Sequence, residues 1–385
     1  MKKRLWIILR IVLGLGLIGV VLFRINFWDE VTLADGRKIT GHILTQKSDR
    51  LEIKDRSGKV HSFGAAEMEK PKFEVRRGLF AILKGIRRGL ALITFLSIGI
   101  IFVIASFRWR MLLKVQGVTL GFFRIFRLTI MGIFFNNFVP GLTGGDFVKA
   151  YYISRETHRK TEAITTVFLD RVVGLFALSI LAAVMVLVNI SRPEFRAASI
   201  VVYAFLLMGI LAAVTLYSQR VRQRLAGRLG RISFLERDLS FIPIKRIARD
   251  IDRALILYRN HKRAVLMAVL VSFFAHSIAI LANFGYGQAL GLKAGIGHYF
   301  LLFPIIAMIS SFPVLPAGWG VGEAAYVFGF GLVGVPPTQA ITLSLLYRIS
   351  LNIFWGLPGG VMFMASPRRV TRREMAAELS SDAQG

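Results

Sequence analysis

An apolar part of the chain is interrupted at residues 136–146 by two asparagines, a proline, three glycines and an aspartate. We call residues 136–146 the first break. Residues 122–139 and 163–189, on either side of it, are apolar enough to form membrane helices. In hydrocarbon, an irregular backbone persists only where protein buries it or where it lines a cavity. The first break is therefore predicted to form part of a pocket.

A second break, residues 312–323, has the same composition: prolines and glycines followed by an acid, Glu323. Each break precedes an arginine in an apolar helix at the same distance, since 171 − 146 = 25 and 348 − 323 = 25. Two breaks of one composition and one spacing indicate an internal repeat. The alternative is a pair of structural kinks, because proline and glycine are ordinary in membrane helices.

The composition predicts an all-α polytopic membrane protein. The 385 residues are 55% hydrophobic, and several apolar runs reach the length of about 20 residues that spans a bilayer. The net charge of +28 would suggest nucleic acid in a soluble protein, but these charges flank apolar runs and fit cytoplasmic loops facing anionic lipid. The absence of cysteine excludes disulfides and cysteine metal sites. We expect no cofactor and no nucleic-acid partner.

The N-terminal part divides into a membrane span and a small β-module. Residues 1–27 begin with basic residues and lack a signal-peptide cleavage site, so we expect a retained first span. Residues 28–75 contain short runs rich in β-branched residues, with hairpin turns at Asp35-Gly36 and Ser57-Gly58. They predict a barrel-like module. The basic residues 76–88 are expected to form an interfacial helix.

Residues 76–367 form the predicted membrane domain, and charge sets its orientation. Basic residues flank the first break on both sides, which favours a re-entrant helical hairpin that enters from the cytoplasm. The second break then enters from outside, so the repeats 117–189 and 291–364 have inverted orientation, as in many transporters. Both termini, including the basic tail 368–385, are predicted to be cytoplasmic. The β-module then lies in the periplasm or outside the cell.

An ionisable side chain inside a membrane is costly unless it is paired or solvated by water. The residues that need such a partner or solvent are Asp146, Asp170, Arg171, Glu323 and Arg348. We expect the glycines to leave backbone N–H groups free for an anionic headgroup, while the arginines bind its phosphate. The acids would pair with the arginines when no lipid is bound. Helix capping is the alternative role for Asp146 and Glu323. Asp170 and Arg171 are helix neighbours that cannot face one another, so each needs a partner elsewhere. The predicted headgroup-binding residues are Asn137, Pro140, Gly144, Gly145, Asp146, Lys149, Asp170, Arg171, Pro316, Gly318, Gly320, Glu323 and Arg348.

These motifs resemble a known family. The pattern PGxxGGD at residues 140–146, the later Asp170-Arg171, and LPxGxGVxEA at residues 315–324 followed by Tyr347-Arg348 are similar to the lysylphosphatidylglycerol synthase transmembrane-region family. The resemblance covers about residues 85–367 and implies a flippase-like protein of the bacterial inner membrane. Lys149 stands where the family often has arginine, and the insertion 28–72 is not a family feature. No room for the acyltransferase domain follows residue 364, so synthase activity is not expected.

The leading functional hypothesis is a flippase or translocase for a phosphate-bearing lipid, either a phospholipid or a polyprenyl phosphate. A homodimer or a lipid-modifying enzyme is a possible partner. The alternative is a proton-coupled small-solute transporter that uses Asp146 and Glu323. A third hypothesis, an intramembrane enzyme with Asp146 and Asp170 as an acid pair, is disfavoured because no histidine or cysteine lies near the breaks.

Overall fold

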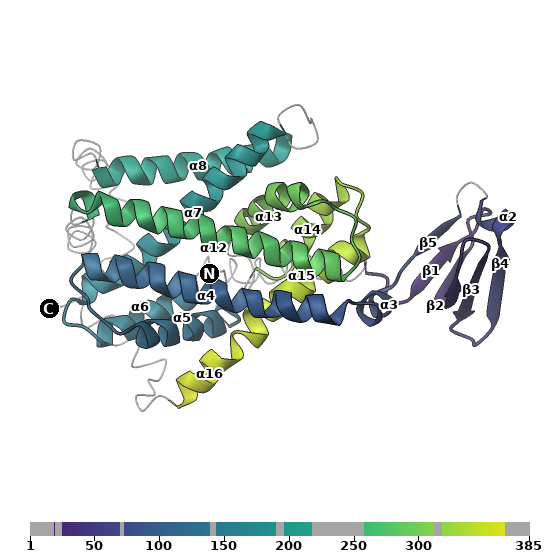
Figure 1. Ribbon diagram of the computed structural model, residues 1–385, viewed down its shortest axis with the longest axis horizontal. Helices are drawn as coiled ribbons and strands as arrows, with labels where there is room; N and C mark the ends of the chain where they lie inside the picture. Colours follow the sequence, from purple (N-terminus) through teal and green to yellow (C-terminus); the bar gives the residue numbers. More distant parts are fainter. Residues whose placement is uncertain are drawn as a thin grey trace, which may run out of the picture.

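The protein is mainly helical, with a small β-module at one end (Figure 1). The computed structural model describes residues 19, 25–69, 73–138, 144–189, 196–217, 258–311 and 318–365. Most of the predicted first span, 1–27, and all of the predicted cytoplasmic tail, 368–385, lie outside these residues. The strands are β1 Asp29–Thr32, β2 Lys38–Gln46, β3 Arg50–Asp55, β4 Val60–Gly64 and β5 Glu74–Arg76. The helices are α2 Ala65–Met68, α3 Leu79–Lys84, α4 Arg88–Val115, α5 Phe122–Asn136, α6 Gly144–Arg155, α7 Lys160–Val188, α8 Arg196–Tyr217, α12 Lys262–Ala289, α13 Ile296–Ser310, α14 Val321–Gly331, α15 Pro337–Arg348, the π-helical turn η2 Ile349–Phe354, and α16 Leu357–Met364.

Helices of membrane length dominate the described part of the chain. Four stretches there are long and apolar enough to cross a bilayer: α4, α7, α12, and the stretch Pro337–Met364 formed by α15, η2 and α16. Large apolar side chains remain exposed on them, as at Leu92, Ile93 and Leu187, which suits a lipid environment. The prediction of a polytopic membrane protein is confirmed at this level.

Two of the long helices, α4 and α12, run antiparallel. The N–H of Arg87, just before α4, donates to the carbonyl of Ala289 at the end of α12 (3.0 Å). Further along, Arg108 Nη1 of α4 donates to Ser272 Oγ of α12 (2.7 Å). The helix pair α5–α6 follows the end of α4, and the pair α13–α14 follows the end of α12. The two helix pairs therefore lie toward opposite ends of the bundle (Figure 1).

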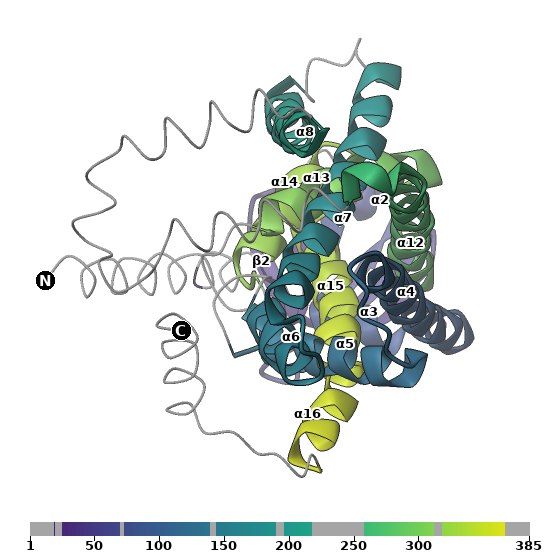
Figure 2. The same cartoon turned by 90° about the vertical axis from the view of Figure 1, so that its left-hand side faces the viewer.

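The helix lengths recur in the same order in both halves. Helices α4, α5, α6 and α7 have 28, 15, 12 and 29 residues. Helices α12, α13 and α14 have 28, 15 and 11 residues, and the stretch Pro337–Met364 has 28. Viewed along the long axis, α15 lies in the middle of the bundle and α8 at its edge (Figure 2).

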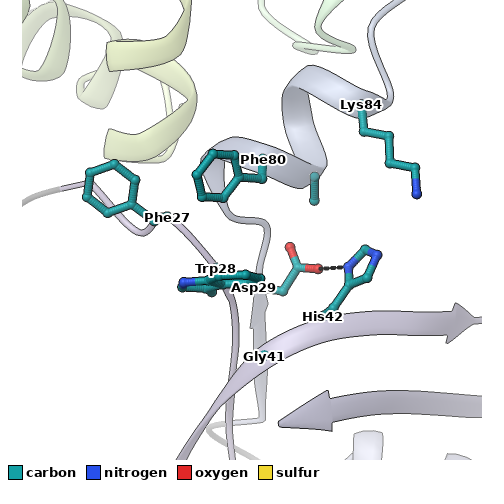
Figure 3. Close-up of a pocket in the computed structure, with 8 residues that line it drawn as sticks. Phe27, Trp28, Asp29, Gly41, His42, Phe80 and Lys84 are labelled. Atoms are coloured by element: carbon teal, nitrogen blue, oxygen red, sulfur yellow. Dashed lines mark ion pairs between the residues drawn. The ribbon is translucent and has the colours of Figure 1, made fainter. Parts of the chain in front are cut away.

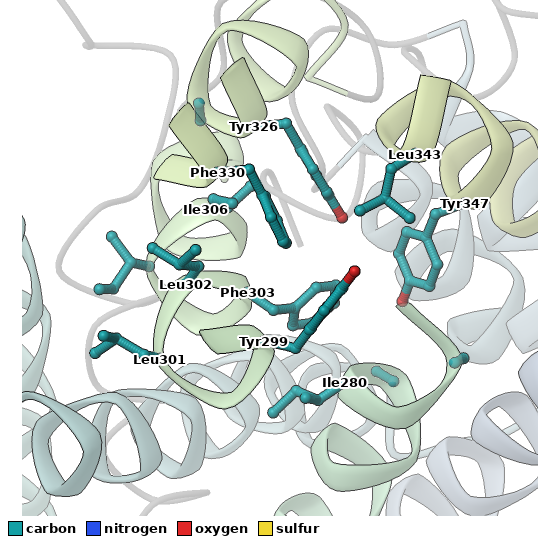
Figure 4. Close-up of a cluster of buried hydrophobic side chains, with 14 of the residues drawn as sticks. Ile280, Tyr299, Leu301, Leu302, Phe303, Ile306, Tyr326, Phe330, Leu343 and Tyr347 are labelled. Atoms are coloured by element: carbon teal, nitrogen blue, oxygen red, sulfur yellow. The ribbon is translucent and has the colours of Figure 1, made fainter. Parts of the chain in front are cut away.

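Most of the bundle core is apolar, but one part carries hydroxyl groups. Tyr299 of α13, Tyr326 of α14 and Tyr347 of α15 are buried and direct their hydroxyls toward the same part of this core (Figure 4). Asn283 of α12 donates to Tyr326 Oη (2.6 Å). Burying a polar group is costly unless it is hydrogen-bonded, so this contact fixes α12 against α14.

The β-module is a five-stranded antiparallel sheet in the order β4-β3-β2-β1-β5. Gly36 and Gly58 have φ angles of 87° and 93°, as the predicted hairpin turns require. The predicted strands are present, but β5 was not predicted. It extends the sheet to Arg76, the first of residues 76–88, which were expected to form an interfacial helix. The structure instead divides these residues among β5, the short α3 and the start of α4, because Arg76 pairs with Glu30 of β1 in the sheet.

The edge strands of the sheet are β4 and β5. Phe63 of β4 lies 5.8 Å from Phe73, the residue before β5, between ring centroids. The predicted closure of this module into a barrel stays a prediction.

Candidate functional site

The first break positions an ion pair between α6 and α7. Asp146, in the first turn of α6, accepts hydrogen bonds on Oδ2 from Arg171 Nε (2.9 Å) and Nη2 (2.6 Å). Lys149 Nζ lies 3.7 Å from the other carboxylate oxygen and 4.3 Å from the centroid of the Trp109 ring. The Arg171 side chain remains 35% exposed, whereas those of Asp146 and Lys149 are each 10% exposed. One acid thus holds two cations, of which Arg171 is the accessible one.

The second break builds a similar pair between α14 and α15. Glu323 Oε1 lies 3.1 Å from Arg348 Nε, and Oε2 accepts the N–H of Gly320 (2.6 Å). The N–H of Arg348 Nε is not aligned with Oε1, so this contact is an ion pair rather than a hydrogen bond. The Arg348 guanidinium also lies 5.0 Å from the Trp319 ring centroid. Glu323 therefore both caps α14 and neutralises an arginine.

Each acid pairs with the arginine 25 residues after it, at both breaks. This spacing was the first sign of a repeat, and it corresponds to the same contact made twice. The pairs differ in access. The Arg348 side chain is 8% exposed, against 35% for Arg171. The first pair thus has one partly exposed member, Arg171, whereas both members of the second pair are buried.

The pairing within each break predicts a specific energetic coupling. A double-mutant cycle of Arg171→Gln with Asp146→Asn should give a coupling of about 1–3 kcal/mol in unfolding free energy. The same cycle with Glu323→Gln should give a coupling near zero, because Glu323 pairs with Arg348. Thermal unfolding of purified protein measures both cycles. Equal coupling in the two would contradict the pairing observed here.

Glycines let the helices of each pair approach closely. A Cβ atom on Gly145 would lie 1.8 Å from the carbonyl oxygen of Gly132 in α5, and one on Gly318 would lie 2.6 Å from that of Ser310 in α13. Gly318 and Gly320 also have φ angles of 69° and 80°. These positions therefore need glycine for steric and conformational reasons.

The prediction that the glycines leave their amides free is wrong at two positions. The N–H of Gly145 donates to Asn136 Oδ1 (2.7 Å), and that of Gly320 donates to Glu323 Oε2. Gly144 begins α6. Pro140 and Pro316 lie outside the described residues. The arginines and Lys149 are the cationic groups in the described part of this site.

A chain of contacts links the two breaks. Asn137 Nδ2, just after α5, donates to the carbonyl of Asn352 (2.9 Å) in the π-helical turn η2. Asn352 Nδ2 in turn donates to the carbonyl of Arg348 (3.2 Å). π-Helical turns occur frequently at functional sites. Asn137, predicted from the sequence as a site residue, thus connects the first break through Asn352 to the backbone of Arg348.

Removing this link should destabilise the protein. Asn137→Ala leaves the Asn352 carbonyl without this donor, which we expect to cost about 1–3 kcal/mol of unfolding free energy. Asn189→Ala is the matched control, because Asn189 Nδ2 donates to the Met185 carbonyl within the same helix end (2.9 Å). Thermal unfolding followed by size-exclusion chromatography compares the two. Equal midpoints would show that the link carries no stability.

Asp170 is hydrogen-bonded to Arg108 rather than to a residue of the first break. It accepts two hydrogen bonds from Arg108 of α4, at Nε (2.7 Å) and Nη2 (2.9 Å), and Arg108 also donates to Ser272 of α12. All three residues are buried, and together they join α4, α7 and α12. The sequence reasoning missed Arg108, which follows a long apolar run. The signal available was Asp170 itself, an acid in an apolar helix that required a cation.

The predicted partners for Asp170 and Arg171 on other segments are thus confirmed. Two histidines make packing contacts: His276 contacts the Gly174 carbonyl (2.9 Å) and His61 contacts Asp55 (2.9 Å). Within the described residues no three histidine, aspartate or glutamate side chains gather as metal ligands would.

Comparison with known proteins identifies the family of this architecture. The sequence matches the family described as "Lysylphosphatidylglycerol synthase TM region" over residues 76–359. The chain belongs to this family. The match begins at Arg76, the last residue of β5, so nearly all of the β-module lies outside the matched residues.

Archaeal membrane proteins are among the relatives of this family member. A UPF0104 membrane protein of Methanocaldococcus jannaschii is 22% identical over 280 residues, which cover 71% of this chain and 83% of the relative. A UPF0104 membrane protein of Pyrococcus horikoshii is 24% identical over 290 residues, which cover 68% of this chain and 82% of the relative. A UPF0104 membrane protein of Methanothermobacter thermautotrophicus is 24% identical over 283 residues, which cover 68% of this chain and 79% of the relative. Membership of this family fits a lipid-related role in the membrane.

Proposed function

We propose that this protein is a lipid flippase or translocase that binds a phosphate-bearing headgroup at the two breaks. The observation that carries the proposal is the acid–arginine pair that occurs at both breaks with the same spacing, next to membrane-length helices. A structural ion pair alone is weak evidence for stability, because removing charges from water is costly. Two such pairs at glycine-rich breaks are better explained by a ligand that competes for the arginines.

The first break would bind the phosphate. Arginine presents a planar fork of donors that matches phosphate in a bidentate way, and Lys149 adds a second positive charge. Asp146 holds both cations when no lipid is bound, and a phosphate would displace it from Arg171. The 35% exposure of the Arg171 side chain gives the headgroup a route of approach. The buried Arg348 would exchange partners only when the helices around the second break move.

We propose further that the halves of the membrane domain are inverted repeats with re-entrant hairpins. Three observations support this: the matching helix lengths, the antiparallel α4 and α12, and the helix pairs toward opposite ends of the bundle (Figure 1). Inverted repeats with broken helices allow one site to face either side of a membrane in turn. That is the motion that lipid translocation requires.

We propose a bacterial inner-membrane location, with both termini in the cytoplasm and the β-module on the opposite side. The lipid is a phospholipid or a polyprenyl phosphate, and the protein acts without catalysing a reaction. A second copy of the chain or a lipid-modifying enzyme is the proposed protein partner. The basic segment 219–263 supports the orientation by its charge.

The orientation predicts which cysteines are labelled. The chain has no native cysteine, so one introduced residue reports alone. Ser48 is exposed in the turn between β2 and β3, whereas the hydroxyl of Ser57 bonds Asp55 (2.6 Å) and is better left in place. Ser48→Cys in intact cells should react with a membrane-impermeant maleimide. Labelling only after the inner face is opened would show that the β-module lies in the cytoplasm and would contradict this orientation.

A reconstitution assay tests the function. Purified protein in vesicles should move headgroup-labelled phospholipid between leaflets, as measured by loss of fluorescence to a reductant added outside. Arg171→Gln should abolish the movement, whereas Arg171→Lys should retain part of it, because lysine keeps the charge but loses the bidentate geometry. Full movement by Arg171→Gln, or none by the native protein with phospholipid and polyprenyl-phosphate probes alike, would refute the proposal.

A further inference from the structure

A pocket of about 120 Å³ lies where the β-module meets the membrane domain (Figure 3). It is bounded by the start of β1, the middle of β2 and the short α3. A water molecule occupies about 30 Å³ in the liquid, so the pocket has room for a group the size of one phosphate but not for a sugar or nucleotide. Its lining residues are Phe27, Trp28, Asp29, Gly41, His42, Phe80, Ala81 and Lys84.

The position of the pocket relative to the membrane follows from the span beside it. Helix α4 begins at Arg88 and is a membrane-length helix, and α3 ends at Lys84, four residues earlier. The chain is fixed here by the N–H of Leu79, which donates to the Asn26 carbonyl (2.8 Å), and by the N–H of Asn26, which donates to Thr338 Oγ1 of α15 (3.2 Å). The pocket is therefore held at the end of a span, at the level of lipid headgroups.

The aromatic residues at this level form an exposed apolar surface. Phe80 lies 6.2 Å from Phe27 and 5.6 Å from Trp28, between ring centroids. Phe27, Trp28 and Phe80 are 40%, 43% and 55% exposed. Aromatic rings concentrate at membrane interfaces, where an apolar body meets a wet surface. This aromatic group therefore suits contact with lipid rather than with water alone.

Three cations accompany the rings. Lys84 lines the pocket, and Arg87 and Arg88 follow it at the start of α4; all three are exposed. Among the residues that the structure describes, none of the three forms an ion pair with an acid. The one acid of the pocket, Asp29, is already neutralised: it accepts the N–H groups of Gly78 (2.8 Å) and Ile43 (3.0 Å), and Arg77 and His42 lie within 4 Å of it.

We propose that this junction is a second lipid site, which binds the phosphate of an anionic phospholipid of the surrounding bilayer. Lys84 and Arg87 hold the headgroup, and the rings of Phe27, Trp28 and Phe80 contact the glycerol and upper acyl region. Cations near a membrane surface attract anionic lipid, and the exposed apolar residues at the start of α4 receive the chain. The site stands apart from the two breaks and does not depend on which side the β-module faces.

A fluorophore on Leu83→Cys tests the site, since Leu83 is exposed on α3 and the chain has no other cysteine. In nanodiscs, phosphatidylglycerol with a spin label near the top of its acyl chain should quench the fluorophore at a mole fraction roughly fivefold lower than phosphatidylcholine with the same label. The variant Lys84→Gln/Arg87→Gln should lose this preference.

The matched control is Arg37→Gln/Lys38→Gln, which removes the same charge at the other end of β1. The fluorophore on this control variant should be quenched by the two lipids as in the native protein. Equal quenching by both lipids in the native protein would overturn the site, and so would an equal loss in both variants. Size-exclusion profiles of the variants establish that each one is folded.

Discussion

Gly145→Ala should separate α5 from α6 and lower the unfolding free energy by about 3 kcal/mol or more. The added Cβ would lie 1.8 Å from the carbonyl oxygen of Gly132, and a helix backbone cannot yield as a flexible side chain can. The shift would also move Asp146, one residue along, away from Arg171. We therefore expect both a lower thermal midpoint and loss of lipid movement.

Gly331→Ala is the matched control for this substitution. Gly331 ends α14, and a Cβ there would meet no atom within 4 Å. In a helix, alanine is favoured over glycine by about 1 kcal/mol, so this variant should be as stable as the native protein or more so. A native midpoint for Gly145→Ala would mean that the helices of the first break are not in the close contact described here.

Asp170→Asn should cost about 3–5 kcal/mol, because it leaves the Arg108 cation buried without its carboxylate. Thermal or denaturant unfolding of the purified protein measures this loss. The comparison is Glu74→Gln, which breaks the ion pair of Glu74 with Arg76 on the sheet surface. Both partners there are more than half exposed, at 57% and 52%, so the expected cost is below about 1 kcal/mol.

A double substitution separates structure from ligand binding at Asp170. Apolar residues of similar volume often replace a buried ion pair without loss of stability. Arg108→Met/Asp170→Leu should therefore recover most of the stability and retain lipid movement, since the pair joins helices and does not face the first break. A stable double variant without lipid movement would return Asp170 to the binding site.

The sequence was sufficient to predict the acid–arginine pairs and the class of the fold. Charged residues in apolar helices require partners, and the shared spacing of 25 residues indicated a repeat. The choice between Asp146 and Glu323 as partner of Arg171 stayed open at that stage, because sequence spacing does not give the distance between two segments. The packing of α6 on α7 decides it.

Other features depend on tertiary contacts that no local pattern reveals. Strand β5 is three residues long and forms because β1 offers it an edge. The π-helical turn η2 has no distinctive composition, and its contact with Asn137 joins residues 215 positions apart. The amides of Gly145 and Gly320 were expected to be free. Each instead donates to a nearby side chain, Gly145 to Asn136 and Gly320 to Glu323, and these side chains could equally have bound a ligand.

Lipid retention by arginine variants tests the central claim most directly. Native protein extracted gently and measured by native mass spectrometry should carry a phosphate lipid. Arg171→Gln/Asp146→Asn removes both members of the first pair, and should fold yet lose most of this lipid. Arg108→Met/Asp170→Leu, which removes a pair away from the breaks, should keep it. Undiminished lipid on the first double variant would contradict a headgroup site at the first break.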